Sequence, residues 1–169
     1  MARLLLSKST LLKEKKRLES FLRFLPSLEM KRQQLMVAVK KSQARSDSLR
    51  QQAAANEKII SDEVPMLAIE GIDLQNLCQV KSVQQQRKNV VGVWLLDISS
   101  IEFELAEISI LAKPHWVDFL QAKLKQDIEI SIMLDIEFFN LNRLKQELKK
   151  VTQRVNLFDK VLIPEARKN

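Results

Sequence analysis

Residues 141–162 have the sequence LNRLKQELKKVTQRVNLFDKVL, and this stretch decides the fold. Its apolar residues recur at alternating steps of three and four, at Leu141, Leu144, Leu148, Val151, Val155, Phe158 and Leu162. This spacing places one narrow apolar stripe along an α-helix and is typical of a coiled coil. Because a lone helix cannot bury such a stripe, the pattern predicts a second helix elsewhere in the chain.

The N-terminal quarter of the chain contains a matching pattern. Two adjoining rows of apolar residues recur seven apart, at Leu4, Leu11, Leu18 and Leu25 and at Phe21, Leu28 and Leu35. We therefore expect the fold class to be mainly α, with the N- and C-terminal helices wound into a long antiparallel two-helix coiled coil. The apolar residues of both ends form its predicted seam. Such a rod transmits force, spans distance or presents surfaces, and rarely holds an active site.

The composition favours long helices. The 169 residues are about one domain long, and they include only two glycines and four prolines. The absence of tyrosine and the 5% aromatic content argue against a β-sandwich or a stacking platform for nucleic acid. No stretch has the roughly 18 uncharged apolar residues that a transmembrane helix needs. The single cysteine, Cys78, is expected to be a structural residue in a reducing compartment.

Three segments are expected along one rod-like domain: an N-terminal helix within 1–60, a central insert with short β-strands at 61–113, and a C-terminal helix within 114–169. The first helix is predicted to run from about Ser9 or Thr10 to about Glu57. Pro26 and Pro164 are each expected to kink a helix, because proline removes a backbone donor and crowds the preceding turn. Pro114 suits the first turn of the second helix.

The central insert is predicted to contain a small β-hairpin. The polar stretch 84–89 separates two β-branched runs and is expected to form the turn between them. Residues 90–96 are apolar apart from Gly92, so both faces of that strand require cover. A two-helix rod is too slender to supply it, and we interpret the strand as a partner-docking element. The alternative is that it packs against Leu105, Ile108, Ile110 and Leu111.

The residues that usually carry catalysis are missing or isolated. His115 is the only histidine, and one histidine with one cysteine cannot complete a structural zinc site. Two glycines cannot build a Gly-rich phosphate loop. Asp127, Asp135 and Glu137 are interpreted as solvated residues flanking the apolar stripe. The sequence therefore predicts no catalytic, cofactor-binding or metal-binding residues and no cofactor.

Positive charge is concentrated at the N-terminus. The chain carries a net charge of +7, and residues 1–57 alone carry +8, whereas residues 58–110 carry −4 and residues 111–169 carry +3. An acidic partner surface, a nucleic acid or an anionic membrane face could each use this charge. The alternative is a solvated helix face that keeps a long rod soluble.

The sequence also resembles a known family. Residues 151–166, VTQRVNLFDKVLIPEA, resemble the C-terminal helix signature of the D subunit of V-type ATPases. Residues 11–18, LLKEKKRL, and 25–35, LPSLEMKRQQL, are similar to the family's first helix, and 89–94, NVVGVW, to the strand of its central insert. Family members usually continue for several helical turns beyond the position of Pro164, whereas this sequence ends at Asn169.

The resemblance implies that the chain is the central rotor shaft of an ion-translocating rotary ATPase, a non-catalytic subunit of a complex on the cytoplasmic face of a membrane. Its implied partners are the catalytic and regulatory nucleotide-binding subunits of the head, a small central-stalk subunit, and a socket subunit on the membrane rotor ring. No nucleic acid and no direct membrane insertion are expected. The head would face the basic residues Lys15, Lys16, Arg17, Lys149, Lys150 and Arg154. The small stalk subunit would bind at Val90, Val91, Gly92, Val93, Trp94 and Leu95.

Two other functions are compatible with the same fold. The basic first helix could belong to a nucleic-acid-binding helical hairpin, although the acidic middle of the chain and the few aromatic residues argue against it. A generic coiled-coil scaffold with no motor role would show the same apolar stripes. Only the match at residues 151–166 separates the rotor shaft from a scaffold.

Overall fold

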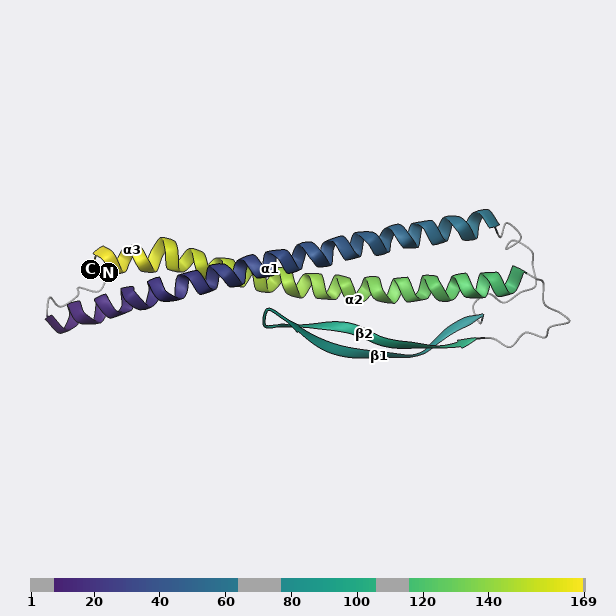
Figure 1. The fold of residues 1–169 in the computed structure, drawn as a ribbon, viewed down its shortest axis with the longest axis horizontal. Coiled ribbons are helices and arrows are strands. Elements are labelled where there is room, and N and C mark those ends of the chain that lie inside the picture. The colour runs from purple at the N-terminus through teal and green to yellow at the C-terminus, as the bar shows by residue number, and fades with distance from the viewer. Residues whose placement is uncertain (1–7, 64–76, 106–115, 169) are drawn as a thin grey trace. The chain divides into compact units, whose positions relative to one another are not determined.

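The computed structural model describes residues 8–63, 77–105 and 116–168 (Figure 1). Helix α1 (Lys8–Glu63) is followed by strands β1 (Cys78–Val90) and β2 (Val93–Leu105) and by helix α2 (Trp116–Leu157). A π-helical segment, η3 (Phe158–Leu162), and the short helix α3 (Ile163–Lys168) continue from α2. The predicted fold class, mainly helical with a β-hairpin between an N- and a C-terminal helix, is confirmed.

The chain divides into two compact units, and each contains part of both long helices. Unit 1 comprises Met1–Lys40 and Asn142–Asn169, and unit 2 comprises Lys41–Leu141. In unit 1 the Phe21 and Phe158 rings meet edge to face with centroids 5.3 Å apart. Lys31 follows Phe21 in the chain, whereas its ion-pair partner Glu147 precedes Phe158. The distance from Lys31 Nζ to Glu147 Oε1 is 3.7 Å. These two contacts show that the helices of unit 1 run antiparallel.

The described core of unit 1 is apolar. Leu35 of α1 and Leu144 and Val151 of α2 are each no more than 1% exposed. Pro26 does not end α1, which continues as one helix to Glu63 and is therefore longer than the sequence predicts. Beside the proline, the Ser27 hydroxyl donates to the Phe24 carbonyl at 2.8 Å.

Pro164 changes the helix that contains it. Before it, the Ile163 N–H donates to the Phe158 carbonyl five residues back, so one turn is π-helical. Proline has no N–H of its own, and its ring crowds the carbonyl four residues earlier, which explains why the wider turn lies there. A π-turn contains an extra residue and rotates the helix that follows. As a result Ile163 is buried and Leu162 is half-buried.

Unit 2 contains the second half of α1, the first part of α2 and the hairpin. The Asn56 side-chain amide donates to the Lys123 carbonyl at 3.2 Å, which joins α1 to α2. Leu77, Val117 and Leu120 form an apolar cluster, on which the half-buried Ile60, Trp116 and Leu124 pack. Residues 128–132 alternate in the manner of a strand, yet they lie in α2, as the flanking apolar stripe predicts.

The hairpin is confirmed, but the predicted position of its turn is wrong. Residues 84–89 belong to β1, and Val90 pairs directly with Val93, so the turn is Val91–Gly92. Val91 and Gly92 have positive φ angles of 55° and 80°, as a two-residue type I′ turn requires. The Asn89 side-chain oxygen accepts the Gly92 N–H at 2.9 Å and stabilises this turn. Each strand has 13 residues, and the polar run is exposed along its whole length.

Candidate functional site

The predicted seam residues differ in burial. Leu35, Leu141, Leu144, Val151 and Val155 are buried. Leu18, Phe21, Leu25, Leu28, Leu148, Phe158 and Leu162 are half-buried. Leu11 is 63% exposed, and Leu4 lies outside the described residues. The structure adds Ile163 to the buried residues of the seam. Pro164 is the feature of the sequence that could have indicated this shift of the apolar stripe from Leu162 to Ile163.

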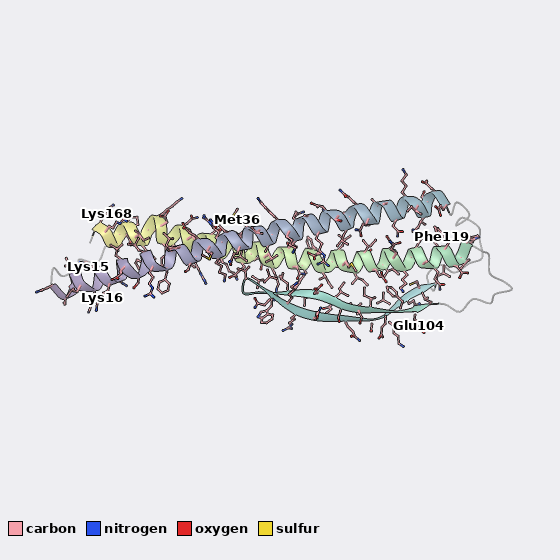
Figure 2. The ribbon with its side chains drawn as sticks, in the orientation of Figure 1. Lys15, Lys16, Met36, Glu104, Phe119 and Lys168 are labelled. Carbon is pink, nitrogen blue, oxygen red and sulfur yellow. The ribbon has the colours of Figure 1, made fainter. Side chains whose placement is uncertain are left out.

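The six predicted head-facing basic residues are all exposed, and all belong to unit 1. Figure 2 labels Lys15 and Lys16 on the early turns of α1. Two of the six already have acidic neighbours on their own helix: Arg17 lies 3.0 Å from Glu14, and Lys150 lies 4.0 Å from Glu147. A groove of about 410 Å³ on α1 is lined by Thr10, Lys13, Glu14, Lys16, Arg17, Ser20 and Phe21.

The six residues predicted to dock a partner lie at the hairpin turn, and they face different directions. Val93 is 9% exposed, whereas the next residue, Trp94, is 56% exposed. Successive strand residues point to opposite faces, which accounts for this difference. Val90, Val91 and Leu95 are half-buried, and Gly92 is exposed. Of the alternative packing partners, Leu105 is 46% exposed, and Ile108, Ile110 and Leu111 lie outside the described residues.

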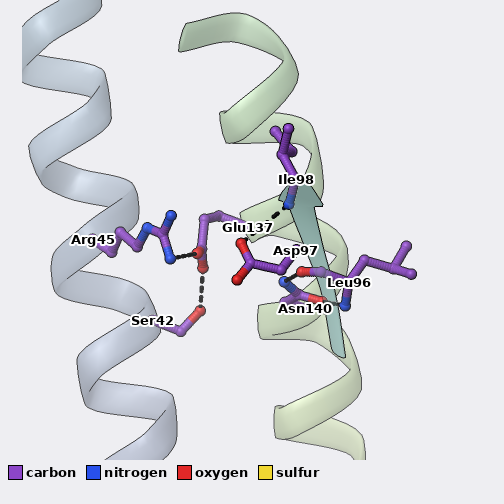
Figure 3. A network of polar contacts seen from close by, with 7 residues as sticks. All are labelled: Ser42, Arg45, Leu96, Asp97, Ile98, Glu137 and Asn140. Atoms are coloured by element: carbon purple, nitrogen blue, oxygen red, sulfur yellow. Dashed lines mark hydrogen bonds and ion pairs between the residues drawn. The ribbon is translucent and has the colours of Figure 1, made fainter. Parts of the chain in front are cut away.

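Asn140 joins the hairpin to α2 (Figure 3). Its side-chain oxygen accepts the Leu96 N–H at 2.8 Å, and its side-chain nitrogen donates to the Leu96 carbonyl at 2.7 Å. The side chain is 5% exposed, so water does not compete freely for these hydrogen bonds. Asn140 is not among the residues predicted from sequence, although an asparagine directly before the seam residue Leu141 is a polar interruption of the apolar pattern.

Glu137 is buried, and its interpretation as a solvated flanking residue is wrong. It accepts a hydrogen bond from the Ser42 hydroxyl at 2.8 Å, and Arg45 Nη1 lies 3.2 Å from its other oxygen. Extending the three-and-four spacing one step back from Leu141 reaches Glu137 and could have found it. A groove of about 280 Å³ beside it is lined by Arg45, Asp97, Ile98, Ser99, Ser100, Ile101, Glu129, Met133, Ile136 and Glu137.

The single cysteine lies among the residues that the structure describes. Cys78 is buried, and desolvation raises the pKa of its thiol, an effect that Lys125 opposes and Glu129 reinforces.

Within residues 8–63, 77–105 and 116–168, no three His, Cys, Asp or Glu side chains are grouped to hold a metal ion. In these same ranges no helix is both long and apolar enough to span a bilayer. Pro114 and His115 lie outside the described residues.

Comparison with known proteins gives consistent matches along the chain. The family model for the ATP synthase D subunit matches residues 10–169. The V-type ATP synthase D subunit of Borreliella burgdorferi is 34% identical over 171 aligned positions, which cover 100% of this chain and 83% of the relative. The proteins of the same name from Chlamydia caviae and Chlamydia pneumoniae are each 28% identical. The first match covers 95% of this chain and 78% of the relative, and the second covers 96% and 79%.

These matches include both long helices, the hairpin and the residues around Pro164. The family match spans far more than half of the chain, and the B. burgdorferi relative is similar along the whole length of this chain. The chain therefore belongs to the family of ATP synthase D subunits.

Proposed function

We propose that this chain is the central-stalk rotor subunit of a V-type ATPase. It transmits torque between ATP turnover in the catalytic head and proton or sodium translocation by the membrane ring. The observation that carries this proposal is the family match over residues 10–169, which includes both paired helices and the hairpin. The similarity to the V-type protein of B. burgdorferi, which covers this whole chain, supports the choice of a V-type complex.

The helix pair of unit 1 has the properties that a torque-bearing shaft needs. Twisting one helix against the other would expose Leu144 and Val151, which are both 1% exposed, and each buried side chain of this size contributes about 1.5–3 kcal/mol. The chain serves this role without catalysing a reaction.

The proposed partners follow the surfaces of the two units. The catalytic and regulatory nucleotide-binding subunits of the head face the six exposed basic residues, and the small central-stalk subunit binds at the hairpin turn. A socket subunit connects the shaft to the membrane rotor ring, so the chain is held peripherally at the cytoplasmic face. Trp94 is the strongest single candidate for the stalk contact, because a 56% exposed indole offers a partner a large apolar surface.

The first experiment is purification of the tagged chain from gently solubilised membranes of its own host. We expect a membrane-derived complex that contains a nucleotide-binding hexamer, hydrolyses ATP and pumps ions after reconstitution. The same host with an untagged chain is the control. Recovery of the chain alone would favour the scaffold function, and recovery with RNA that is lost at high salt would favour nucleic-acid binding.

Two sets of substitutions test the surfaces in that complex. Reversing Lys15, Lys16 and Arg17 to Glu should lower the number of ions pumped per ATP, whereas reversing the exposed Lys40 and Lys41 should not. Trp94→Asp should weaken binding of the small stalk subunit, whereas Glu104→Lys, exposed on the same strand, should leave it unchanged. Val93→Asp is unsuitable, because Val93 is buried and the substitution would disturb the hairpin itself. Equal effects of test and control variants would contradict the assigned surfaces.

A further inference from the structure

The two hydrogen bonds of Asn140 complete the outer edge of β2. Leu96 pairs with Arg87 of β1, yet its own N–H and C=O are both bonded to Asn140. In an antiparallel ladder the N–H and C=O of one residue point to the same side, so this side of Leu96 faces away from β1. The Asn140 amide therefore takes the place that a third strand would occupy.

Two further contacts hold the opposite end of the hairpin on α2. The Gln121 amide donates to the Leu77 carbonyl at 2.8 Å, and Lys125 Nζ lies 5.2 Å from the centre of the Phe103 ring. Roughly 28 Å of helix separates Gln121 from Asn140 at 1.5 Å per residue. Roughly 30 Å of strand separates Leu96 from Leu105, which pairs with Cys78, the residue after Leu77. The hairpin thus lies along α2 and is held at both ends.

Asn140 supplies a directional contact at the turn end, where the buried residue of the strand is the apolar Val93. Apolar contacts tolerate sliding, but the amide matches the N–H and C=O of one outward-facing residue only. If the hairpin slid along α2 by one residue, Leu95 or Asp97 would lie opposite Asn140, and the N–H and C=O of those residues point toward β1. An isolated two-stranded hairpin is marginally stable at best, so its position depends on such contacts.

The same turn of α2 also binds α1. Glu137, three residues before Asn140, holds Ser42 and Arg45, and Figure 3 shows both sets of contacts together. We propose that Asn140 is a positioning residue that locks the turn end of the hairpin to α2 in one register. The hairpin then turns together with the helix pair of unit 2 and presents Trp94 to its partner at a fixed place. The identity of this partner, the small stalk subunit, rests on the proposed function.

The test compares Asn140→Leu and Asn140→Asp with the control Asn142→Asp, which changes an exposed asparagine two residues further along α2. Leucine has a similar shape and removes both hydrogen bonds. Aspartate can still accept the Leu96 N–H, but its second oxygen faces the Leu96 carbonyl and repels it. Hydrogen exchange of backbone amides is measured on the full chain, and circular dichroism reports whether the helices remain intact.

We expect Leu96 to exchange about tenfold to a hundredfold faster in both Asn140 variants, as the loss of one or two buried hydrogen bonds implies. The acceleration should be confined to the turn end of the hairpin, and the amide of Phe103 at the other end should keep its protection. Unchanged exchange at Leu96 would overturn the proposal. A uniform acceleration of all amides would also overturn it, because it would show general destabilisation and no positioning.

A second measurement concerns the partner. Binding of the small stalk subunit to Asn140→Leu should weaken about fivefold if the correctly placed hairpin is populated about one fifth of the time. Asn142→Asp should bind as the unchanged chain does. Unchanged binding to Asn140→Leu, with faster exchange at Leu96, would overturn the role of this position in partner recognition. Because the exchange experiment needs no partner, a failure of the proposed function leaves the positioning test intact.

Discussion

Among the described residues of unit 1 the buried side chains are all apolar, whereas unit 2 also buries Ser46, Asn56, Glu137 and Asn140. Both units contain parts of the same two helices. In unit 1 the buried side chains are leucine, valine and isoleucine, and the ion pair between its helices, from Lys31 to Glu147, joins partly exposed side chains. In unit 2 they meet partly through hydrogen bonds, such as the 2.8 Å bond from Ser42 to Glu137. The difference follows from what each unit has to hold.

Unit 2 must hold a hairpin as well as a helix pair. Apolar burial stabilises a helix pair without selecting one orientation of a strand, because the hydrophobic effect has no direction. A hydrogen bond selects particular atoms, and a buried donor left without an acceptor is destabilising. Polar contacts are therefore suited to fixing three elements in one arrangement, while the apolar seam of unit 1 is suited to stability.

The largest expected effect comes from removing a side chain of the apolar seam. Leu144→Ala should lower the free energy of unfolding by about 2–5 kcal/mol, because it leaves a cavity where the leucine is 1% exposed. Urea denaturation followed by circular dichroism measures the loss. Lys145→Ala changes an exposed neighbour and should have little effect. Similar losses in the free energy of unfolding of the two variants would contradict the comparison of the two units, because the stability of unit 1 would then not depend on its apolar seam.

A smaller effect is expected from the polar contacts of unit 2. Glu137→Ala should lower the free energy of unfolding by about 1–3 kcal/mol, since it removes the acceptor of the Ser42 hydroxyl. Arg45→Ala should cost less than about 1 kcal/mol, because the Arg45 side chain is 57% exposed and water screens its ion pair. The same urea experiment measures both. Equal losses would show that charge, and not the buried hydrogen bond, holds α1 to α2 here.

The contrast between the units also explains what could be predicted from sequence. A periodic apolar stripe identifies the buried face of a helix without knowledge of its partner, and Leu144, Val151 and Val155 follow from their spacing alone. Asn140 does not, because its role depends on Leu96, 44 residues earlier in the chain. No local pattern specifies which backbone groups a side chain will meet after the hairpin has packed on α2.

Two local errors have equally specific causes. The polar run 84–89 predicts the hairpin turn at the wrong place, because polar residues are common in exposed strands as well as in turns. The chain turns instead at Val91–Gly92, where the backbone adopts positive φ and Asn89 supports it. The alternating steps of three and four do not reach Ile163, because they assume a regular α-helix. The π-turn before Pro164 shifts the apolar stripe by one residue, from Leu162 to Ile163.

The aromatic contact of unit 1 offers a finer test of its seam. The rings of Phe21 and Phe158 meet at 84°, and such edge-to-face pairs contribute about 0.5–1.5 kcal/mol beyond their buried area. A double-mutant cycle with Phe21→Leu and Phe158→Leu should give a coupling energy in that range. A cycle that pairs Phe158→Leu with Phe24→Leu is the control, because Phe24 is 56% exposed. Equal coupling in the two cycles would contradict direct packing of Phe21 on Phe158.

The smallest effect is expected at Cys78, where unit 2 buries an ionisable thiol. Desolvation raises the pKa of this thiol in the folded chain, and the positive charge of Lys125 partly offsets the rise. The unfolded chain therefore loses its thiol proton at a lower pH than the folded chain does. Burial of the neutral thiol thus stabilises the fold fully below the ordinary thiol pKa of about 8.5, and this contribution is lost as the pH rises above it.

The free energy of unfolding should accordingly fall more between about pH 7.5 and about pH 9.5 in the unchanged chain than in Cys78→Ala. Urea denaturation of both chains at the two pH values measures the difference, and all other titrating groups are shared and cancel. Serine in place of alanine is a useful companion, because its hydroxyl does not ionise in this range but remains polar. An identical pH dependence in all three chains would show that the thiol has the same proton affinity folded and unfolded. The polar character of unit 2 would then rest on its hydrogen bonds alone.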